Sequence, residues 1–418
     1  CNGISESSGV RKQFRLVNFA HLNHLYEEID FQGKHVAIIH IYSEYPEYGW
    51  VEARGEGIAC VDDAARAAVV YLRHFELSGD TLSLRRSRML LQFIRAMQDQ
   101  DGLFYNFIFA DHSINRQGRT SYKSLGWWTA RGIWALGKGL QVFQKVDRSY
   151  AKQLQMDIKR TFVHLDTLLE HYPQIDNING FKIPRWLLYN SAADATSELM
   201  LGLVSYFKVT GSQKVKKYLQ RFAEGLRIMQ LGKGGQFPYG LFLSWKNIWH
   251  GWGNSQIMAL TLTGHWLHDA EILSSAQQEA GYFYPYWQRL SFPREIQFSQ
   301  NDSLRISQIK KFDQIAYAMR PPIVGSLRLY EITHRKKYAQ LAGELATWFF
   351  GNNVAHKPMY NPATGRCYDG ILSKDKINLN SGAESTIEAL YAIMEVEANQ
   401  IAREQINQYI KLKFKKEE

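Results

Sequence analysis

The stretch GEGIACVDDAARAAVVYLRHFELSGD, residues 55–80, decides the fold of this chain. It opens with small residues and with Asp62 and Asp63, whose carboxylates can accept the free backbone N–H groups at a helix N-terminus. Alanines and the run at 69–72 then leave few charged positions, and a helix that is apolar nearly all round is a buried one. After a glycine turn, arginines interrupt the apolar positions of 82–97, as they do on a half-exposed helix. The stretch therefore predicts a hairpin with a buried inner helix and an outer partner.

The same pattern returns about every 60 to 70 residues, which is the kind of period that a repeat architecture produces. The best internal match pairs NSAADATSE at 190–198 with NSGAESTIE at 380–388, because each has an acid at the helix start and a glutamate four residues later. Inner-type segments begin near Asp62, Trp127, Asp194, Asn254, Tyr317 and Glu384. Six such hairpins predict an all-α fold, a six-hairpin α/α toroid. The hairpin at Tyr317 is the irregular one, since Pro321 and Pro322 should break or kink its inner helix.

A closed ring of hairpins keeps most of the 418 residues in one domain, predicted at 55–418. Before it, 14–54 is predicted as a small N-terminal cap with an amphipathic helix at 14–28 and a strand at 35–41. The polar segment 1–13 is predicted as a tether.

The sequence begins with Cys1, and a chain that begins with cysteine resembles a mature bacterial lipoprotein. That resemblance implies a lipid anchor at Cys1 and an exported protein of the periplasm or cell surface. The alternative is that the sequence simply begins at this residue. Export permits disulfides, and ring closure would make neighbours of the loops that carry Cys60 and Cys367, so these two are a candidate pair. Two buried free thiols explain the same residues.

Composition excludes several classes of function. The net charge of +10 and the pI near 9.2 are not concentrated in any run of five basic residues, and no nucleic-acid motif accompanies them, so we expect no nucleic-acid partner. No apolar stretch of about 18 residues is present to span a membrane. Zinc motifs of the HExxH and CxxC types, the phosphate loop, GxGxxG and GxSxG are all missing from the sequence, which implies neither a metal nor an organic cofactor.

In such a ring every loop that enters an inner helix lies on the same face, so the residues at the helix starts should converge there. The candidate catalytic carboxylates are Asp62, Asp63, Asp194 and Glu384. The candidate substrate-binding residues are Trp50, Trp127, Trp128, Tyr239, Trp252, Asn254 and Asp369. Carboxylates among aromatic rings suit glycosidic chemistry, in which one acid protonates the leaving oxygen and another supplies or activates the nucleophile.

Each carboxylate also has a structural interpretation. Asp62, Asp63, Asp194 and Glu384 could act only as helix caps, and Asp101 and Asp369 precede glycine as turn residues do. Glu198 and Glu388 lie one turn deeper, where a buried carboxylate typically holds an arginine.

These residues resemble the six-hairpin glycosidase superfamily over about residues 55–399, through VDDAARA at 61–67 and the segments 127–137 and 380–390. The adjacent aspartates are similar to the pair in bacterial α-1,6-mannan hydrolases. The resemblance implies a glycoside hydrolase acting on a polysaccharide or oligosaccharide. Two alternatives remain: a surface glycan-binding lipoprotein without turnover, and a polysaccharide lyase or sugar epimerase on the same fold, which would use residues such as His250, Tyr239 or Arg185.

For the hydrolase we predict carboxylates from opposite sides of the ring, with Glu384 as general acid and Asp62 or Asp63 as base or nucleophile. Burial at the start of an apolar helix would keep Glu384 protonated, against the effect of the helix N-terminus.

Overall fold

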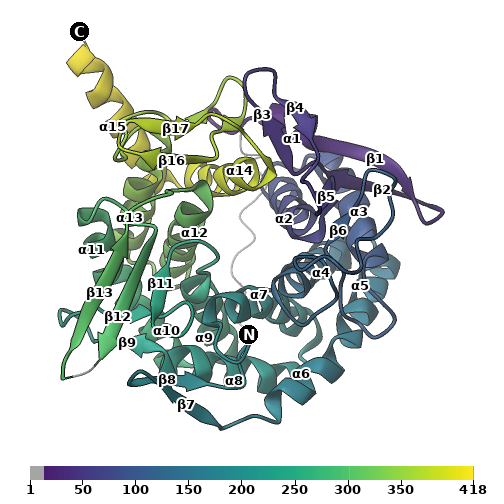
Figure 1. The fold of residues 1–418 in the computed structure, drawn as a ribbon, viewed down its shortest axis with the longest axis horizontal. Coiled ribbons are helices and arrows are strands. Elements are labelled where there is room, and N and C mark those ends of the chain that lie inside the picture. Colours follow the sequence, from purple (N-terminus) through teal and green to yellow (C-terminus); the bar gives the residue numbers. More distant parts are fainter. Residues whose placement is uncertain (1–13, 301, 418) are drawn as a thin grey trace.

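The computed structural model describes residues 14–300 and 302–417, which form a ring of paired helices (Figure 1). Its inner helices are α2 (Val61–Ser78), α4 (Trp127–Val146), α7 (Ala193–Thr210), α9 (Gln256–Leu267), α12 (Ala316–Thr333) and α14 (Ala383–Ala398). Each inner helix packs against the next along the chain, and α14 packs against α2, which closes the ring. The predicted all-α six-hairpin toroid is confirmed.

The outer layer consists of the helices that return from each inner one. These are α3 (Thr81–Ala96), α5 (Arg148–Arg160) with α6 (Phe162–Leu169), α8 (Gln213–Ile228), α10 (Ala270–Gln278) with the π-helical turn η1 (Glu279–Phe283) and α11 (Tyr284–Arg289), α13 (Lys336–Ala346) with the short η2 (Thr347–Phe350), and α15 (Gln400–Glu417). Left-handed residues end four of the six inner helices sharply, two of them glycines: Gly79 after α2 has φ 73° and Gly211 after α7 has φ 63°. Glycine adopts this conformation without a steric penalty, so the chain can turn back at once.

The inner helices all run in the same direction through the ring. Residues at the starts of α2, α4, α12 and α14 line one cleft, whereas residues near the ends of all six inner helices line a separate cavity. We call the face where the helices start the front face. Close packing holds this layer together: a Cβ on Gly137 of α4 would lie only 2.4 Å from the carbonyl oxygen of Gly202 on α7.

Short antiparallel strands lie in the connections between the helices. The two-stranded sheets pair β1 (Tyr26–Phe31) with β2 (Lys34–Ile39), β3 (Tyr42–Glu44) with β4 (Gly49–Val51), β5 (Ala59–Cys60) with β6 (Phe107–Ile108), β7 (Ile175–Ile178) with β8 (Phe181–Pro184), β9 (Gln230–Leu231) with β10 (Leu241–Phe242), β14 (Tyr360–Asn361) with β15 (Arg366–Cys367), and β16 (Gly370–Ser373) with β17 (Lys376–Asn378). A three-stranded sheet combines β11 (Ile248–His250), β12 (Glu295–Gln300) and β13 (Leu304–Lys310).

The N-terminal cap differs from the prediction. Its helix, α1 (Ala20–Leu25), is much shorter than 14–28, and the rest of the predicted helix is strand β1. Gln32 and Gly33 both have positive φ and form the tight turn that pairs β1 with β2, so the local hairpin overrides the helical pattern. The strand predicted at 35–41 is confirmed as β2.

Two further expectations for the chain also change. Helix α12 continues through Pro321 and Pro322, because both lie near its second turn and cost only two backbone hydrogen bonds, while α12 packs against α9 and α14. Cys60 and Cys367 are buried free cysteines. The predicted disulfide between them is therefore wrong, and the alternative of two buried free thiols is confirmed. The lipid anchor on Cys1 and the tether at 1–13 lie outside the described residues.

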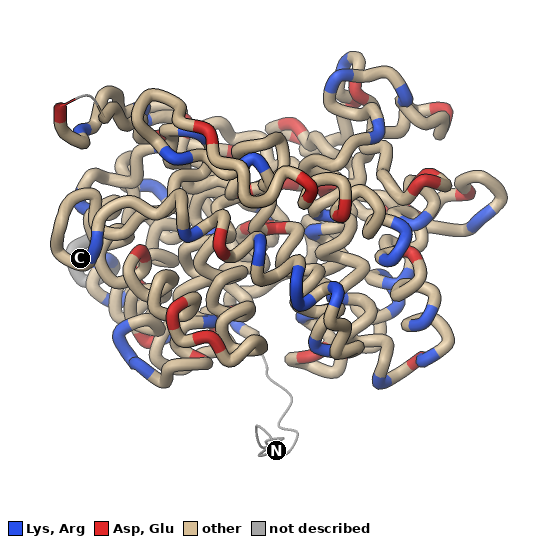
Figure 2. The backbone as a smooth tube through the Cα atoms, turned by 90° about the horizontal axis from the view of Figure 1, so that it is seen from below, with Lys and Arg blue, Asp and Glu red and all other residues tan. Residues whose placement is uncertain are grey.

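Lysine and arginine are interspersed with aspartate and glutamate over the side of the ring seen in Figure 2, so the surplus of +10 is dispersed there. Within 14–300 and 302–417, none of the helices combines the length and the apolar character needed to cross a membrane.

Candidate active site

A cleft on the front face has two adjoining lobes. The polar lobe, of about 320 Å³, is lined by charged and polar side chains that include Asp62, Asp63, Arg66, Asp369, Glu384 and Ser385. The aromatic lobe, of about 540 Å³, is lined by Trp127, Trp128 and Trp252 among others. Asp62, Glu384, Arg131 and Tyr317 line both lobes and therefore lie where the two meet.

The helix starts place these side chains. Asp62, Asp194 and Glu384 are each the second residue of an inner helix, as is Tyr317. The prediction that the three carboxylates gather at the front face is confirmed. Asp62 and Glu384 nevertheless come from adjacent helices rather than from opposite sides of the ring, because α14 packs against α2 at the point of closure.

Asp62 is held in position by two neighbours. Its Oδ1 lies 2.9 Å from Nη1 of Arg131, and its Oδ2 accepts a 3.2 Å hydrogen bond from the side-chain amide of Asn106. The side chain keeps 16% of its surface exposed, enough to reach a bound molecule. Asp62 thus has the environment expected of a nucleophile or a general base.

Asp63 is buried more deeply and is held from two sides. Nη2 of Arg66 lies 2.6 Å from its Oδ1, and the Cys60 thiol donates to its Oδ2 over 3.2 Å. Burial raises the pKa of Asp63 above its ordinary value although Arg66 opposes the shift. Its position suits a residue that orients Arg66 rather than one that attacks a substrate.

Glu384 is the more accessible of the two carboxylates that lie where the lobes meet, the other being Asp62. Its side chain is 45% exposed, and its Oε2 lies 3.2 Å from Nη1 of Arg66. The strong burial predicted for Glu384 is therefore wrong, because the helix start opens directly into the cleft. Asp369, in contrast, accepts hydrogen bonds from the Ser385 hydroxyl (2.6 Å) and the Gly382 amide (2.8 Å), and burial raises its pKa.

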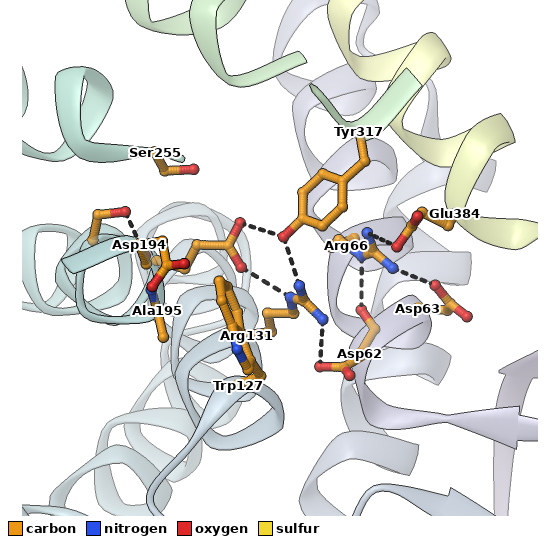
Figure 3. Close-up of polar contacts among 12 residues, drawn as sticks. Asp62, Asp63, Arg66, Trp127, Arg131, Asp194, Ala195, Ser255, Tyr317 and Glu384 are labelled. Carbon is orange, nitrogen blue, oxygen red and sulfur yellow. Dashed lines mark hydrogen bonds and ion pairs between the residues drawn. The ribbon is translucent and has the colours of Figure 1, made fainter. Parts of the chain in front are cut away.

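A network of buried arginines and glutamates lies beneath the cleft as its floor. Figure 3 shows the part of it around Arg66, Arg131 and Tyr317. Glu198 binds Arg131 at 2.9 Å and Arg320 at 3.1 Å. Glu388 binds Arg66 at 3.1 Å and Arg320 at 2.5 Å. Although burial opposes ionisation, Arg131 and Arg320 lower the pKa of Glu198. The interpretation of Glu198 and Glu388 as arginine holders is confirmed.

Tyr317 connects this floor to the cleft. Its hydroxyl accepts a 2.6 Å hydrogen bond from Nη2 of Arg131 and donates to Glu198 over 3.0 Å (Figure 3). Its ring also lies beneath the guanidinium of Arg66, 4.8 Å from the ring centroid. The tyrosine therefore fixes both arginines that hold the carboxylates Asp62 and Glu384.

The walls of the aromatic lobe are indole rings in fixed orientations. Trp127 and Trp252 lie with their ring centroids 5.8 Å apart and tilted by 40°. The Trp128 indole N–H donates to the Phe104 carbonyl over 2.7 Å, which anchors a ring that is only 7% exposed. Flat apolar faces beside polar groups are suited to stacking on a sugar ring.

Asp194 lies behind this wall rather than in the cleft. It is buried, its Oδ2 lies 3.1 Å from Nε2 of His250, and burial raises its pKa. Asn254 is also buried, and its side-chain nitrogen donates to Ser244 and to the His250 carbonyl, so this nitrogen holds the loop.

Two other predicted binding residues lie away from both lobes. Trp50 stacks on His40 with ring centroids 3.7 Å apart and donates to the His24 carbonyl, within the N-terminal cap. Tyr239 packs on Tyr286 at 4.9 Å. Aromatic loop residues that pack on a rim have the same sequence pattern as those that line a site. Of the residues named for lyase or epimerase chemistry, Arg185 pairs with Asp176 at the surface.

The residues missed in the sequence are Arg66, Arg131, Arg320 and Tyr317. A signal for the arginines exists: each is the one cation in the first half of its inner helix, and a buried cation requires an anionic partner. No group of three metal-binding side chains is found among residues 14–300 and 302–417.

No known family profile and no curated protein matches this sequence. Among solved structures, the chain is similar to a sugar epimerase from a ruminal bacterium, with a TM-score of 0.60 and 12% identity over 90% of this chain and 94% of that one. It is also similar to a cellobiose 2-epimerase from Spirochaeta thermophila, with a TM-score of 0.58 and 12% identity over 89% and 90%.

A third similar structure is an alpha-1,6-mannanase of Salegentibacter sp. HEL1_6, with a TM-score of 0.53 and 11% identity over 86% and 92%. That structure is an inactive variant with two adjacent aspartates replaced, in complex with alpha-1,6-mannotetrose. At 11–12% identity these similarities show the fold alone, and they confirm the predicted α/α toroid without assignment to one family.

Proposed function

We propose that this chain is a glycoside hydrolase that cleaves an oligosaccharide or polysaccharide in the two-lobed cleft, with Asp62 and Glu384 as its reacting carboxylates. The observation that carries the proposal is that these two carboxylates line both lobes, at the junction of a charged lobe and an aromatic one. A glycosidic bond placed at this junction would have an acid on each side, which its hydrolysis requires.

The environments of the two carboxylates suggest different roles. Asp62 is paired with Arg131 and serves as nucleophile or base. Glu384 shares the guanidinium of Arg66 with Asp63 and Glu388, and Glu388 also binds Arg320. Glu384 is the member of this group that is open to the cleft, with 45% of its side chain exposed. It is therefore our choice for general acid, since the proton donor must reach the leaving oxygen.

The aromatic lobe supplies the binding surface for the sugar. Trp127 and Trp252 present indole rings next to the junction, and the similar mannanase structure holds a mannotetrose. No histidine among the described residues lines either lobe, which supports hydrolysis over lyase or epimerase chemistry that uses histidine for proton transfer.

A product assay separates these activities. The protein is incubated with a panel of neutral and acidic polysaccharides and oligosaccharides, and products are followed as new reducing ends, as unsaturated sugars and as epimers by NMR. We expect new reducing ends alone. Unsaturated products or epimers without chain cleavage would overturn the proposal.

Variants then test the assigned carboxylates. Glu384→Gln and Asp62→Asn should each lower turnover by about 100-fold or more with unchanged melting. Glu271→Gln is a matched control, because Glu271 is the second residue of outer helix α10 and is 80% exposed. Turnover close to that of the control in both variants would exclude the assignment. Asp63→Asn, tested alongside, shows whether the second aspartate of the pair takes part.

A further inference from the structure

We infer that Asp194 and His250 form a buried hydrogen-bonded pair that positions Trp252 on the wall of the aromatic lobe, so that Asp194 is a positioning residue and not a catalytic one. The inference rests on the proposed function only in assigning sugar binding to that lobe. The contacts that carry it lie in the loop that leads into α9.

The ring of His250 supports Trp252 directly. The two rings are parallel within 4°, with centroids 3.7 Å apart, and Nδ1 of His250 lies 2.8 Å from the backbone carbonyl oxygen of Trp252. A second contact fixes the loop from below, where the Ser244 hydroxyl bonds the backbone of His250. The orientation of the indole thus depends on the orientation of the imidazole.

Asp194 fixes the imidazole in turn. Its Oδ2 lies 3.1 Å from Nε2 of His250, and its Oδ1 accepts a 2.7 Å hydrogen bond from the Ala195 amide. Both side chains are nearly fully buried, and neither lines the cleft. Asp194 therefore cannot touch a bound sugar, although it controls a residue that does.

The geometry also determines how many protons the pair holds. A carbonyl oxygen only accepts, so Nδ1 of His250 must carry a hydrogen. The contact between Nε2 and Asp194 then needs one more proton, either on the imidazole as a cation or on the carboxyl group. Without that proton, a lone pair on nitrogen would face a carboxylate in a buried site.

The surrounding charges reinforce this requirement. Glu198 is the charged group that faces Asp194 from one turn further along α7, and it is itself held by Arg131 and Arg320. Burial raises the pKa of Asp194, which favours retention of the proton. As the pH rises and the pair loses this proton, the support beneath Trp252 should weaken.

Two substitutions at the same position test the inference. In Asp194→Asn, the amide can donate to Nε2 and still accept from Ala195, so the contact survives without a shared proton. We expect kcat and KM within about two-fold of the unchanged protein, and a KM that no longer rises at alkaline pH. Asp194→Ala loses the contact, and we expect KM to rise about three- to ten-fold with little change in kcat, since an aromatic contact is weakened and no reacting group is lost.

A catalytic Asp194 gives the opposite result, because Asp194→Asn would then lose about 100-fold in kcat. That loss, or an alkaline rise in KM that is equal in Asp194→Asn and the unchanged protein, would overturn the inference. If no glycan is cleaved at all, the proposed function fails, but the Asp194–His250 pair can still be tested. The measurement is then the pH dependence of the near-ultraviolet circular dichroism of the tryptophans. This signal should change at alkaline pH in the unchanged protein and stay constant in Asp194→Asn, and the same change in both would refute the pair.

Discussion

Replacing Arg320 with methionine should strongly destabilise the ring. Arg320 is fully buried and binds three partners: Glu388 at 2.5 Å, Glu198 at 3.1 Å and the Ser255 hydroxyl at 3.0 Å. Methionine fills most of the volume but leaves the carboxylates of Glu198 and Glu388 with one cation fewer. Removal of one partner from a buried ion pair costs about 3–5 kcal/mol, because a buried charge loses its compensation.

The expected change in melting temperature follows from the length of the chain. Unfolding entropy of about 2.1 cal/mol/K per residue amounts to about 0.9 kcal/mol/K for 418 residues, so Arg320→Met should melt about 3 to 6 °C lower. Lys214→Met is the control, because its pair with Asp166 is half exposed on both sides and should be worth less than about 1 kcal/mol. Differential scanning calorimetry compares the two. Equal melting temperatures for Arg320→Met and Lys214→Met would refute the role of the buried network.

Two other predictions concern stability outside the cleft. Burial raises the pKa of Glu279 to about 8, so its carboxyl group is protonated in the folded protein at neutral pH. The free energy of unfolding therefore falls as the pH rises from the pKa of this glutamate in the unfolded chain toward about 8. Urea unfolding should therefore show that the stability of Glu279→Gln, relative to that of the unchanged protein, is greater at about pH 9 than at about pH 5. An equal difference at both pH values would contradict this. Gly137→Ala places a Cβ against the backbone of Gly202 and should lower the free energy of unfolding by about 1–3 kcal/mol. Gly281→Ala is the control, because its Cβ meets only the Lys337 ammonium at 3.8 Å and the change should be nearly neutral. A lower melting temperature for Gly281→Ala than for Gly137→Ala would exclude the close contact.

The fold was predictable from the sequence because its determinants are local and repeated. The apolar inner helix with an acid at its start recurs at Asp62, Asp194 and Glu384, and the structure places all three as second residues of inner helices. The cap was less predictable, since the apolar spacing of 14–28 fits a helix. The turn at Gln32 and Gly33 instead pairs its second half with β2.

The candidate site was predictable only in part, because sequence position does not show which way a side chain points. Asp62 and Asp194 hold the same place in their helices, yet Asp62 meets the cleft while Asp194 meets His250. Trp50 in β4 and Trp252 in the loop before α9 are both stacked on a histidine, and only Trp252 lines a lobe. Such differences depend on contacts between segments that are distant in the chain.

The common direction of the inner helices explains why acids gather at the front face. Each helix N-terminus carries about half a positive charge, so the converging starts of the helices stabilise carboxylates there. The opposite cavity, where the helices end with partial negative charge, is lined by four cations, Arg73, Lys138, Lys208 and Arg328, and by two acids, Glu76 and Glu331. Cations therefore predominate there, in line with the same principle.

The two carboxylates at the junction of the lobes differ in how firmly they are held. Asp62 contacts the guanidinium of Arg131 and the side-chain amide of Asn106, and its side chain is 16% exposed. Glu384 has one partner, Arg66, and its side chain is 45% exposed. A nucleophile or base acts from a fixed position, whereas a proton donor must reach the leaving oxygen of the substrate. This difference in restraint and exposure favours Glu384 as the general acid in the proposed reaction and Asp62 as its nucleophile or base.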